Sequence, residues 1–210
     1  MAYLNDIQAL ITSKCTATTV KEFLTFSNLT HTMATRAAYY VNLTNQLLKK
    51  SGASAKEKQN DLFALQVQRA VKVHIQYLMM LMAIEKIEQY QFKDKNIAPI
   101  LEMCVKVFAL KMLEKDTQGL FACGYFGPDS QNLVEASFDV LMKEMRPHMV
   151  PLVEAFHLEG QDASVIGNKY GDIYELQYEV SKKAPINEKV VPEWYEKYQK
   201  PAMTMHKAKL

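Results

Sequence analysis

The chain has 210 residues, 49% of them hydrophobic, and a formal net charge of +2. Such a length and hydrophobic content fit one large domain, or two tightly fused helical layers, around a packed core. Acidic and basic residues are interspersed, so we expect no nucleic-acid partner. No apolar run reaches the roughly 18 residues of a membrane span, so we also expect no membrane-spanning segment.

Glycine and proline are few, with seven of each, and most lie where helices could end, so we predict a chain that is helical almost throughout. The first long helix is predicted over residues 18–50. It ends at Ser51 and Gly52, where the glycine would adopt a left-handed cap.

A second helix is predicted over residues 54–90, and two apolar seams follow it at spacings of three and four. Together the seams cover more than half of the helix circumference, which predicts a helix buried between neighbours at the centre of a bundle. The first seam contains Phe63, Val67, Ala70, His74, Tyr77, Leu81 and Ile84, and the second contains Val71, Ile75, Leu78 and Met82.

A third helix is predicted from Asp94, whose side chain could cap it, through Met112. A fourth begins after Asp129 and continues to Met145, before Pro147 and Pro151 interrupt its hydrogen bonds.

Four long amphipathic segments with short connections favour an all-α, antiparallel helical bundle, which we assign to residues 1–160. Residues 161–210 are expected to add a short helix over 172–183 and an extended tail, packed on the bundle and containing Pro185, Pro192 and Pro201.

The sequence shows no catalytic, metal-binding or cofactor-binding constellation. The five histidines are spread over different elements, and no carboxylate has the surroundings expected of a catalytic base. His74 lies within an apolar seam and Arg69 about one and a half turns earlier. We favour a structural histidine that is hydrogen-bonded to a neighbouring helix, and the alternative is a pocket in which Arg69 and His74 contact an anionic group.

The last three residues, Ala208, Lys209 and Leu210, are a conservative variant of the Ser-Lys-Leu signal that directs proteins to the peroxisome. The import receptor reads a small residue, a base and a leucine with a free carboxylate. The sequence therefore predicts a peroxisomal location and the import receptor as a partner.

Two stretches, RPHMVPLVEAF from Arg146 to Phe156 and GNKYGDIYELQYEVSKKAPIN from Gly167 to Asn187, resemble the carboxyl-terminal region of the peroxisomal acyl-CoA oxidases. A weaker resemblance extends over essentially the whole chain. Glu154 stands where aspartate is usual, and one residue of a Tyr-Asp-Gly turn is missing. The residues that carry the signature are Arg146, Phe156, Tyr170, Gly171, Tyr174, Pro185 and Asn187.

The resemblance implies a flavoenzyme of fatty acid β-oxidation, which uses FAD to oxidise acyl-CoA to trans-2-enoyl-CoA and passes the electrons to oxygen, yielding hydrogen peroxide. In the family, the flavin-binding sheet domain and the segment with the catalytic glutamate precede the region that this chain resembles. We therefore expect FAD in the complete enzyme, none on this chain alone, and no acyl-CoA oxidation by this chain alone.

The family's second helical domain packs over the catalytic half and replaces the second dimer of the related tetrameric dehydrogenases. The resemblance thus implies two partners, a catalytic half of acyl-CoA oxidase and a second copy in a dimer. The chain is interpreted either as a carboxyl-terminal part of such an enzyme or as a separate protein that keeps only this domain. The alternative function is a non-catalytic helical accessory or assembly subunit derived from the same domain.

Overall fold

The computed structural model describes residues 2–156, 173–189 and 191–207, and this part of the chain is helical and contains no strand. The predicted all-α class is therefore confirmed. Two compact units are distinguished, which we call the amino-terminal unit (Met1–His148) and the carboxyl-terminal unit (Met149–Leu210). The predicted division after residue 160 falls outside the described residues and stays a prediction.

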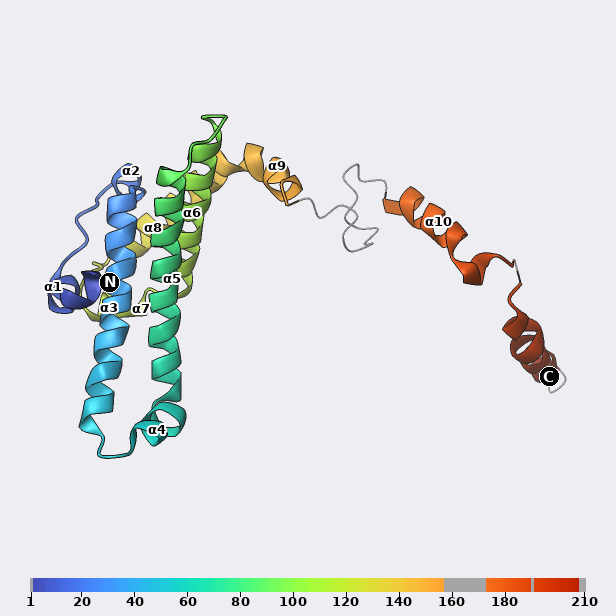
Figure 1. Cartoon of the computed structure of the whole chain (residues 1–210), viewed down its shortest axis with the longest axis horizontal. Helices are drawn as coiled ribbons and strands as arrows, with labels where there is room; N and C mark the ends of the chain where they lie inside the picture. Colours follow the sequence, from blue (N-terminus) through green and yellow to red (C-terminus); the bar gives the residue numbers. More distant parts are fainter. Residues whose placement is uncertain (1, 157–172, 190, 208–210) are drawn as a thin grey trace. The chain divides into compact units, whose positions relative to one another are not determined.

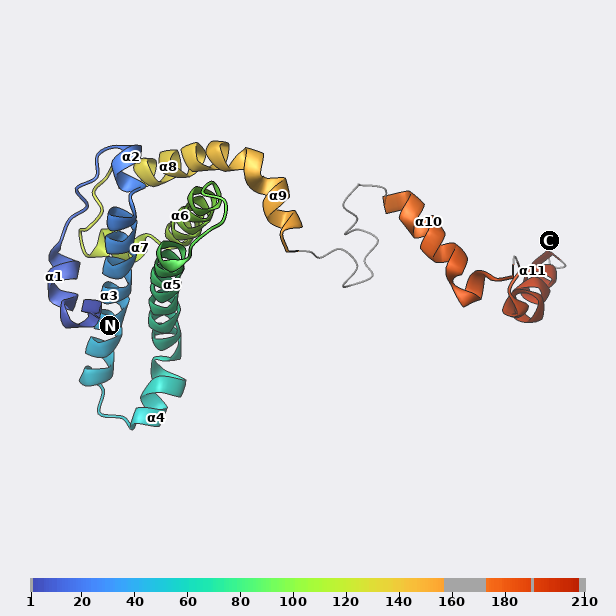
Figure 2. The same ribbon diagram turned by 45° about the horizontal axis from the view of Figure 1, so that its top comes forward.

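Four long helices form the body of the amino-terminal unit, as predicted. They are α3 (Phe26–Lys50), α5 (Ala64–Gln89), α6 (Ile97–Lys115) and α8 (Ser130–Met145). The first three run antiparallel in succession, and α8 lies crosswise to α3 and α5 (Figures 1 and 2). The crosswise helix contacts α6 and the short α2, so it covers one end of the helix layer.

The first predicted helix is interrupted before α3, because threonines start two separate helices. Thr19 and Glu22 form a reciprocal capping box at the start of α2 (Val20–Phe23). Thr25 then caps α3, since its hydroxyl accepts a hydrogen bond from the Asn28 amide at 3.3 Å. The remaining short elements of this unit are η1 (Ala2–Asn5), α1 (Ile7–Thr12), α4 (Ala55–Glu57), η2 (Lys58–Leu62), α7 (Gln118–Ala122) and η3 (Arg146–His148).

The predicted left-handed cap at Gly52 is wrong, because α3 ends on an extended Ser51 with φ −86° and ψ 136°. A left-handed glycine ends α7 instead, where Gly124 has φ 75°. The Tyr125 amide donates to the Leu120 carbonyl at 2.9 Å, and the Gly124 amide donates to the Phe121 carbonyl at 3.0 Å. This paired pattern is a Schellman motif, which requires a residue that tolerates positive φ.

The prediction that α5 is buried on both of its seams is also wrong. Ala70, Val73, Tyr77 and Met80 pack into the core with α3 and α6, because those helices contact α5 on one side. Three residues of the second seam, Val71, Ile75 and Met82, are exposed, whereas Leu78 is partly buried and packs against the core. We call its exposed residues, together with Met79, the α5 stripe: Val71, Ile75, Met79 and Met82, which are 50%, 48%, 54% and 61% exposed.

The break predicted at Pro147 is present, because α8 ends at Met145 and the short η3 follows. The break predicted at Pro151 is wrong, since Pro151 lies within α9 (Met149–Glu154), the first helix of the carboxyl-terminal unit. The predicted short helix is present as α10 (Ile173–Lys183), followed by η5 (Pro185–Asn187).

The end of the chain is more helical than the predicted extended tail. A π-helical segment, η6 (Tyr195–Gln199), leads into α11 (Lys200–Lys207). Pro201 is the second residue of α11, within the first turn, where a proline is tolerated.

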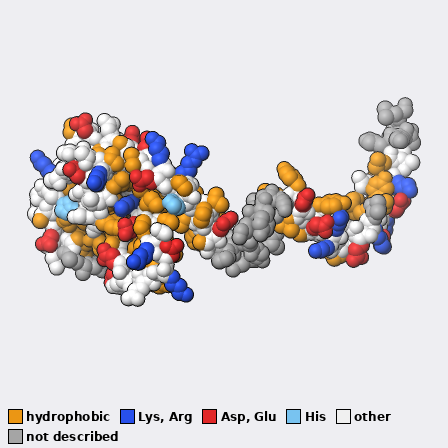
Figure 3. Space-filling model, turned by 90° about the horizontal axis from the view of Figure 1, so that it is seen from above, with side chains coloured by type: hydrophobic (Ala, Val, Ile, Leu, Met, Phe, Trp, Pro, Cys, Tyr) orange, Lys and Arg blue, Asp and Glu red, His pale blue; other side chains and the backbone are white. Residues whose placement is uncertain are grey.

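No residue of the carboxyl-terminal unit whose exposure is described is buried, over 149–156, 173–189 and 191–204. Large hydrophobic side chains lie on its surface instead (Figure 3). They include Phe156 at 74% and Tyr174 at 86% exposure. This unit therefore lacks an internal core among its described residues.

Candidate functional site

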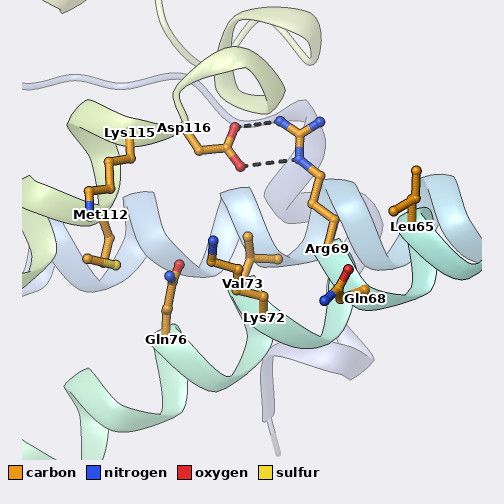
Figure 4. Close-up of a pocket in the computed structure, with 9 residues that line it drawn as sticks. All are labelled: Leu65, Gln68, Arg69, Lys72, Val73, Gln76, Met112, Lys115 and Asp116. Carbon is orange, nitrogen blue, oxygen red and sulfur yellow. Dashed lines mark hydrogen bonds and ion pairs between the residues drawn. The ribbon is translucent and has the colours of Figure 1, made fainter.

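The Asp116 carboxylate, which directly follows α6, is bonded to side chains of two other long helices. Arg69 of α5 donates two hydrogen bonds to this carboxylate, with Nη2 2.7 Å from Oδ1 and Nε 3.3 Å from Oδ2 (Figure 4). The Tyr40 hydroxyl of α3 donates to Oδ1 at 2.9 Å, and the Arg69 guanidinium lies 4.2 Å from the centre of the Tyr40 ring. One carboxylate thus joins three helices through charge-assisted hydrogen bonds.

These contacts shift the protonation equilibria of the side chains around Asp116. Burial, followed by the hydrogen bond to Asp116, raises the pKa of Tyr40 to about 12. The hydrogen bond to the same carboxylate raises the pKa of Arg69. Because the Arg69 side chain is 41% exposed, solvent screens the ion pair, and we expect it to contribute about 1 kcal/mol at most.

A second arginine, Arg36 of α3, is fully buried beside this network. Its Nη1 donates to the Met112 carbonyl at 2.5 Å and its Nη2 to Gln76 Oε1 at 2.6 Å, while Nε has no partner among the described residues. The hydrogen-bond acceptors of this positive charge are therefore neutral oxygens. Burial lowers the pKa of Arg36 to about 10, although the charge of Asp116 acts to raise it. A buried guanidinium without a carboxylate in direct contact is costly.

A cavity of about 500 Å³ lies between α5 and the end of α6, and Arg69 and Asp116 form part of its lining (Figure 4). Its charged lining consists of Arg69, Lys72, Lys115 and Asp116, and Gln76 connects it to Arg36. Neither Lys72 nor Lys115 forms an ion pair within the described part of the chain. Four basic groups thus lie in or directly behind a cavity that has one acidic group.

The structure does not bring Arg69 and His74 into one pocket. Arg69 lines the cavity between α5 and α6, whereas His74 shares a hydrogen bond with the Tyr3 hydroxyl through Nδ1. The Tyr3 and His74 rings are 5.6 Å apart. This arrangement matches the favoured interpretation of His74 as a structural histidine, and a ligand contact by either residue stays a prediction.

Those signature residues that are described lie on the surface. Arg146 and Phe156 are exposed, as are Tyr174, Pro185 and Asn187. Asn187 has a local role, because its side-chain amide donates to the Ser181 carbonyl at 2.8 Å and so closes the end of α10. Two further signature residues, Tyr170 and Gly171, and the targeting residues Ala208, Lys209 and Leu210 lie outside the described residues.

Among the described residues, no group of three or more His, Cys, Asp or Glu side chains could hold a metal ion. No helix in the described part is long and apolar enough to cross a membrane. The lining of the 500 Å³ cavity has no aromatic ring to stack on a flavin, so the cavity does not fit FAD. We therefore derive no chemical step through a flavin on this chain.

Sequence reasoning found Arg69 but missed Arg36, Tyr40, Gln76 and Asp116. The available signal was Arg36 itself, a single charged residue within the run of small and apolar residues from 33 to 41. A charge within a buried stretch of helix needs hydrogen-bond partners from neighbouring helices, which directs the search to polar residues such as Gln76.

The fold and the network define an all-helical packing domain whose polar centre joins three helices. The family model described as acyl-CoA oxidase matches residues 25–204. Peroxisomal acyl-coenzyme A oxidase 1 from Cavia porcellus is 29% identical over 208 residues, which cover 96% of this chain and 31% of that protein. The chain belongs to the acyl-CoA oxidase family and is similar to its helical domain.

Solved structures confirm this fold. Arabidopsis thaliana acyl-CoA oxidase 1 matches 97% of this chain and 31% of its own, with a TM-score of 0.84 and 24% identity. Caenorhabditis elegans acyl-CoA oxidase-2, solved with FAD, ascaroside-CoA and ATP, matches 99% of this chain with a TM-score of 0.77 and 21% identity. The chain spans 20–31% of the length of the curated relatives it matches, and their names agree with the predicted peroxisomal location.

Proposed function

We propose that this chain is the carboxyl-terminal helical domain of an FAD-dependent acyl-CoA oxidase of peroxisomal fatty acid β-oxidation, and that it supports assembly and the active site of the catalytic part. The observation that carries the proposal is the unequal coverage, in which 97% of this chain corresponds to 31% of the Arabidopsis structure. Nearly the whole of this chain thus corresponds to less than a third of the longer relative, which supports its assignment to one domain of such an enzyme.

In the complete enzyme, FAD accepts electrons from acyl-CoA, and oxygen then takes them to give hydrogen peroxide. The role of this chain is to bind the catalytic half, and the assembled enzyme contains a second copy in a dimer. The import receptor would recognise Ala208, Lys209 and Leu210. The extensive exposed hydrophobic surface of the carboxyl-terminal unit supports a role in protein contacts.

The test is co-expression of the full 210-residue chain, carrying an amino-terminal tag, with the flavin-binding part of an acyl-CoA oxidase from the same organism. We expect a complex that retains flavin and produces hydrogen peroxide from acyl-CoA, because the helical domain supports the catalytic part. Failure of the two chains to co-purify would contradict the proposal. Acyl-CoA-dependent peroxide production by the purified chain with added FAD would contradict the absence of catalysis on this chain alone.

The second candidate is a non-catalytic accessory subunit that has kept this domain. The exposed hydrophobic side chains of the carboxyl-terminal unit would serve this function equally well, since they suit any stable protein partner. The same co-expression separates the two functions. An accessory subunit of another complex would leave the solubility, flavin content and peroxide production of the catalytic part unchanged.

A further inference from the structure

The α5 stripe is a continuous hydrophobic surface on one side of a helix. Val71, Ile75, Met79 and Met82 are separated by four, four and three residues, so their side chains lie one above another. The opposite side of the same helix carries the buried Val73, Tyr77 and Met80. The stripe therefore offers a contact surface without weakening the core beneath it.

The basic cavity borders the half of this stripe that contains Val71 and Ile75. Val71 and Lys72 are adjacent on α5, as are Ile75 and Gln76, and the second residue of each pair lines the cavity. One surface thus offers both hydrophobic side chains and basic side chains to a partner. A partner that covered both would remove the stripe from water and would bring a negative charge close to the buried Arg36.

We propose that the α5 stripe and the adjoining cavity form the docking surface for the catalytic part of acyl-CoA oxidase. The partner contributes an apolar face and a carboxylate that enters the cavity toward Lys72 and Lys115. This inference rests on the proposed function and specifies where and by what chemistry the contact is made.

Two observations favour this occupant over a second copy of the chain. In the guinea pig relative, more than two thirds of the protein lies outside the match, so that protein supplies a large partner for a domain of this kind. A symmetric contact between two copies through this surface would bring two net-positive cavities together, which is electrostatically unfavourable. An acidic partner surface complements the cavity instead.

The experiment measures the affinity of the full 210-residue chain for the flavin-binding part, purified from the co-expressed complex and titrated at two salt concentrations. The double variant Ile75→Glu and Met79→Glu is expected to bind at least 30-fold more weakly, the loss typical of a central interface residue. The double variant Lys72→Glu and Lys115→Glu is expected to bind about tenfold more weakly and to lose the salt dependence of binding.

Matched controls come from α8, where Val140 is 38% exposed and Lys143 is also exposed. Val140→Glu and Lys143→Glu introduce the same kinds of change outside the proposed surface, and both should leave the affinity unchanged. Circular dichroism and thermal unfolding of every variant establish that the fold is retained. For a stripe variant that unfolds, Ile75→Ser and Met79→Ser provide a milder replacement with the same expected direction.

The outcomes distinguish the docking surface from the function on which it depends. If the wild-type chain does not bind the flavin-binding part, both proposals fail. If the wild type binds and the stripe variants bind equally well, the surface is wrong and the proposed function stands. If only the lysine variants keep full affinity, the carboxylate contact is wrong. If the stripe variants instead convert a dimer of this chain into monomers, the occupant is a second copy and the proposal is overturned.

Discussion

The two units of this chain differ in where they place their hydrophobic side chains. In the amino-terminal unit, residues such as Leu110 and Leu113 are fully buried among four long helices. In the carboxyl-terminal unit, no described residue with an assigned exposure is buried, and Phe156 and Tyr174 are largely exposed. Yet six of the seven signature residues predicted from the sequence belong to the carboxyl-terminal unit, the exception being Arg146. The predicted signature is thus distinct from the residues that hold the fold together.

This difference has a thermodynamic consequence for the free energy of unfolding. Helices α9, α10 and α11 have 6, 11 and 8 residues. Helices of this length are marginal in water without tertiary packing, so they add little stability of their own. We therefore expect the amino-terminal unit to account for most of the free energy of unfolding of the isolated chain.

The largest expected effect comes from truncating a buried leucine. Leu113→Ala should lower the free energy of unfolding by about 2–5 kcal/mol, because it removes buried methyl groups and leaves a cavity. Val180→Ala on α10, where the side chain is 51% exposed, should change it by less than about 0.5 kcal/mol. Urea unfolding of the full chain, followed by circular dichroism, measures both. Similar losses for the two variants would remove the distinction between the units.

A smaller effect is expected at the contact between α7 and α3. A Cβ atom at Gly119 would lie 2.8 Å from ring atoms of both Tyr39 and Tyr40, so Gly119→Ala forces these rings apart. We expect a loss of about 1–3 kcal/mol, as is usual for overpacking. Gly52→Ala is the matched control, since nothing lies within 4 Å of its added Cβ atom. Equal unfolding midpoints for the two variants would show that α7 does not pack closely on α3.

Alkaline pH should weaken the amino-terminal unit through its buried tyrosines. Burial raises the pKa of Tyr3 and of Tyr40 to about 12, above the ordinary value of 10. Their contribution is therefore complete below pH 10 and is lost as the pH rises toward 12. Arg36 opposes this loss. Burial lowers its pKa to about 10, so above pH 10 the folded protein no longer has to bury the charged form, whereas the unfolded chain stays charged.

With about 1.4 kcal/mol for each unit of pKa difference, Tyr3 and Tyr40 together lose about 3 kcal/mol more than Arg36 offsets between pH 10 and pH 12. Burial also raises the pKa of Tyr77 and Tyr125, which adds to this loss. Urea unfolding at several pH values measures it, alongside the ultraviolet absorbance of ionised tyrosine. Tyr40→Phe should make the decline shallower, because it removes one of the titrating groups. A stability that stays constant or rises up to pH 12 would show that these tyrosines do not control it.

Much of the fold could be predicted from local sequence signals. Helical periodicity and the few proline and glycine residues indicated the four long helices, and Asp129 and Pro147 placed α8 well. The breaks around α2 depend on the hydroxyls of Thr19 and Thr25, which compete with a continuous helix only when their capping bonds form. Gly52 and Gly124 show the same limit, because sequence alone did not reveal which glycine takes a positive φ.

The exposed α5 stripe could not be predicted, because periodicity reports how wide an apolar face is and not how many neighbours cover it. Val71 and Val73 are the same residue type on one helix, but only Val73 faces α3 and α6. The Asp116 network was hidden for a related reason. Its members Tyr40, Arg69 and Asp116 are far apart in sequence and meet only when three helices pack.

The smallest effect on stability is expected at the carboxyl terminus, where the effect on location should be complete. Deleting Leu210 removes the leucine and moves the free carboxylate to Lys209, so the import receptor would no longer find its tripeptide. Because the last residues of a chain generally add little to stability, we expect the free energy of unfolding to change by less than about 0.5 kcal/mol. Fluorescence microscopy of a fusion with the fluorescent protein at the amino terminus measures location, and Lys207→Ala is the control that should stay peroxisomal. Import that persists without Leu210 would show that the chain does not depend on its own tripeptide. Expression in cells that lack the catalytic partner would then distinguish import together with that partner from import through another signal on this chain.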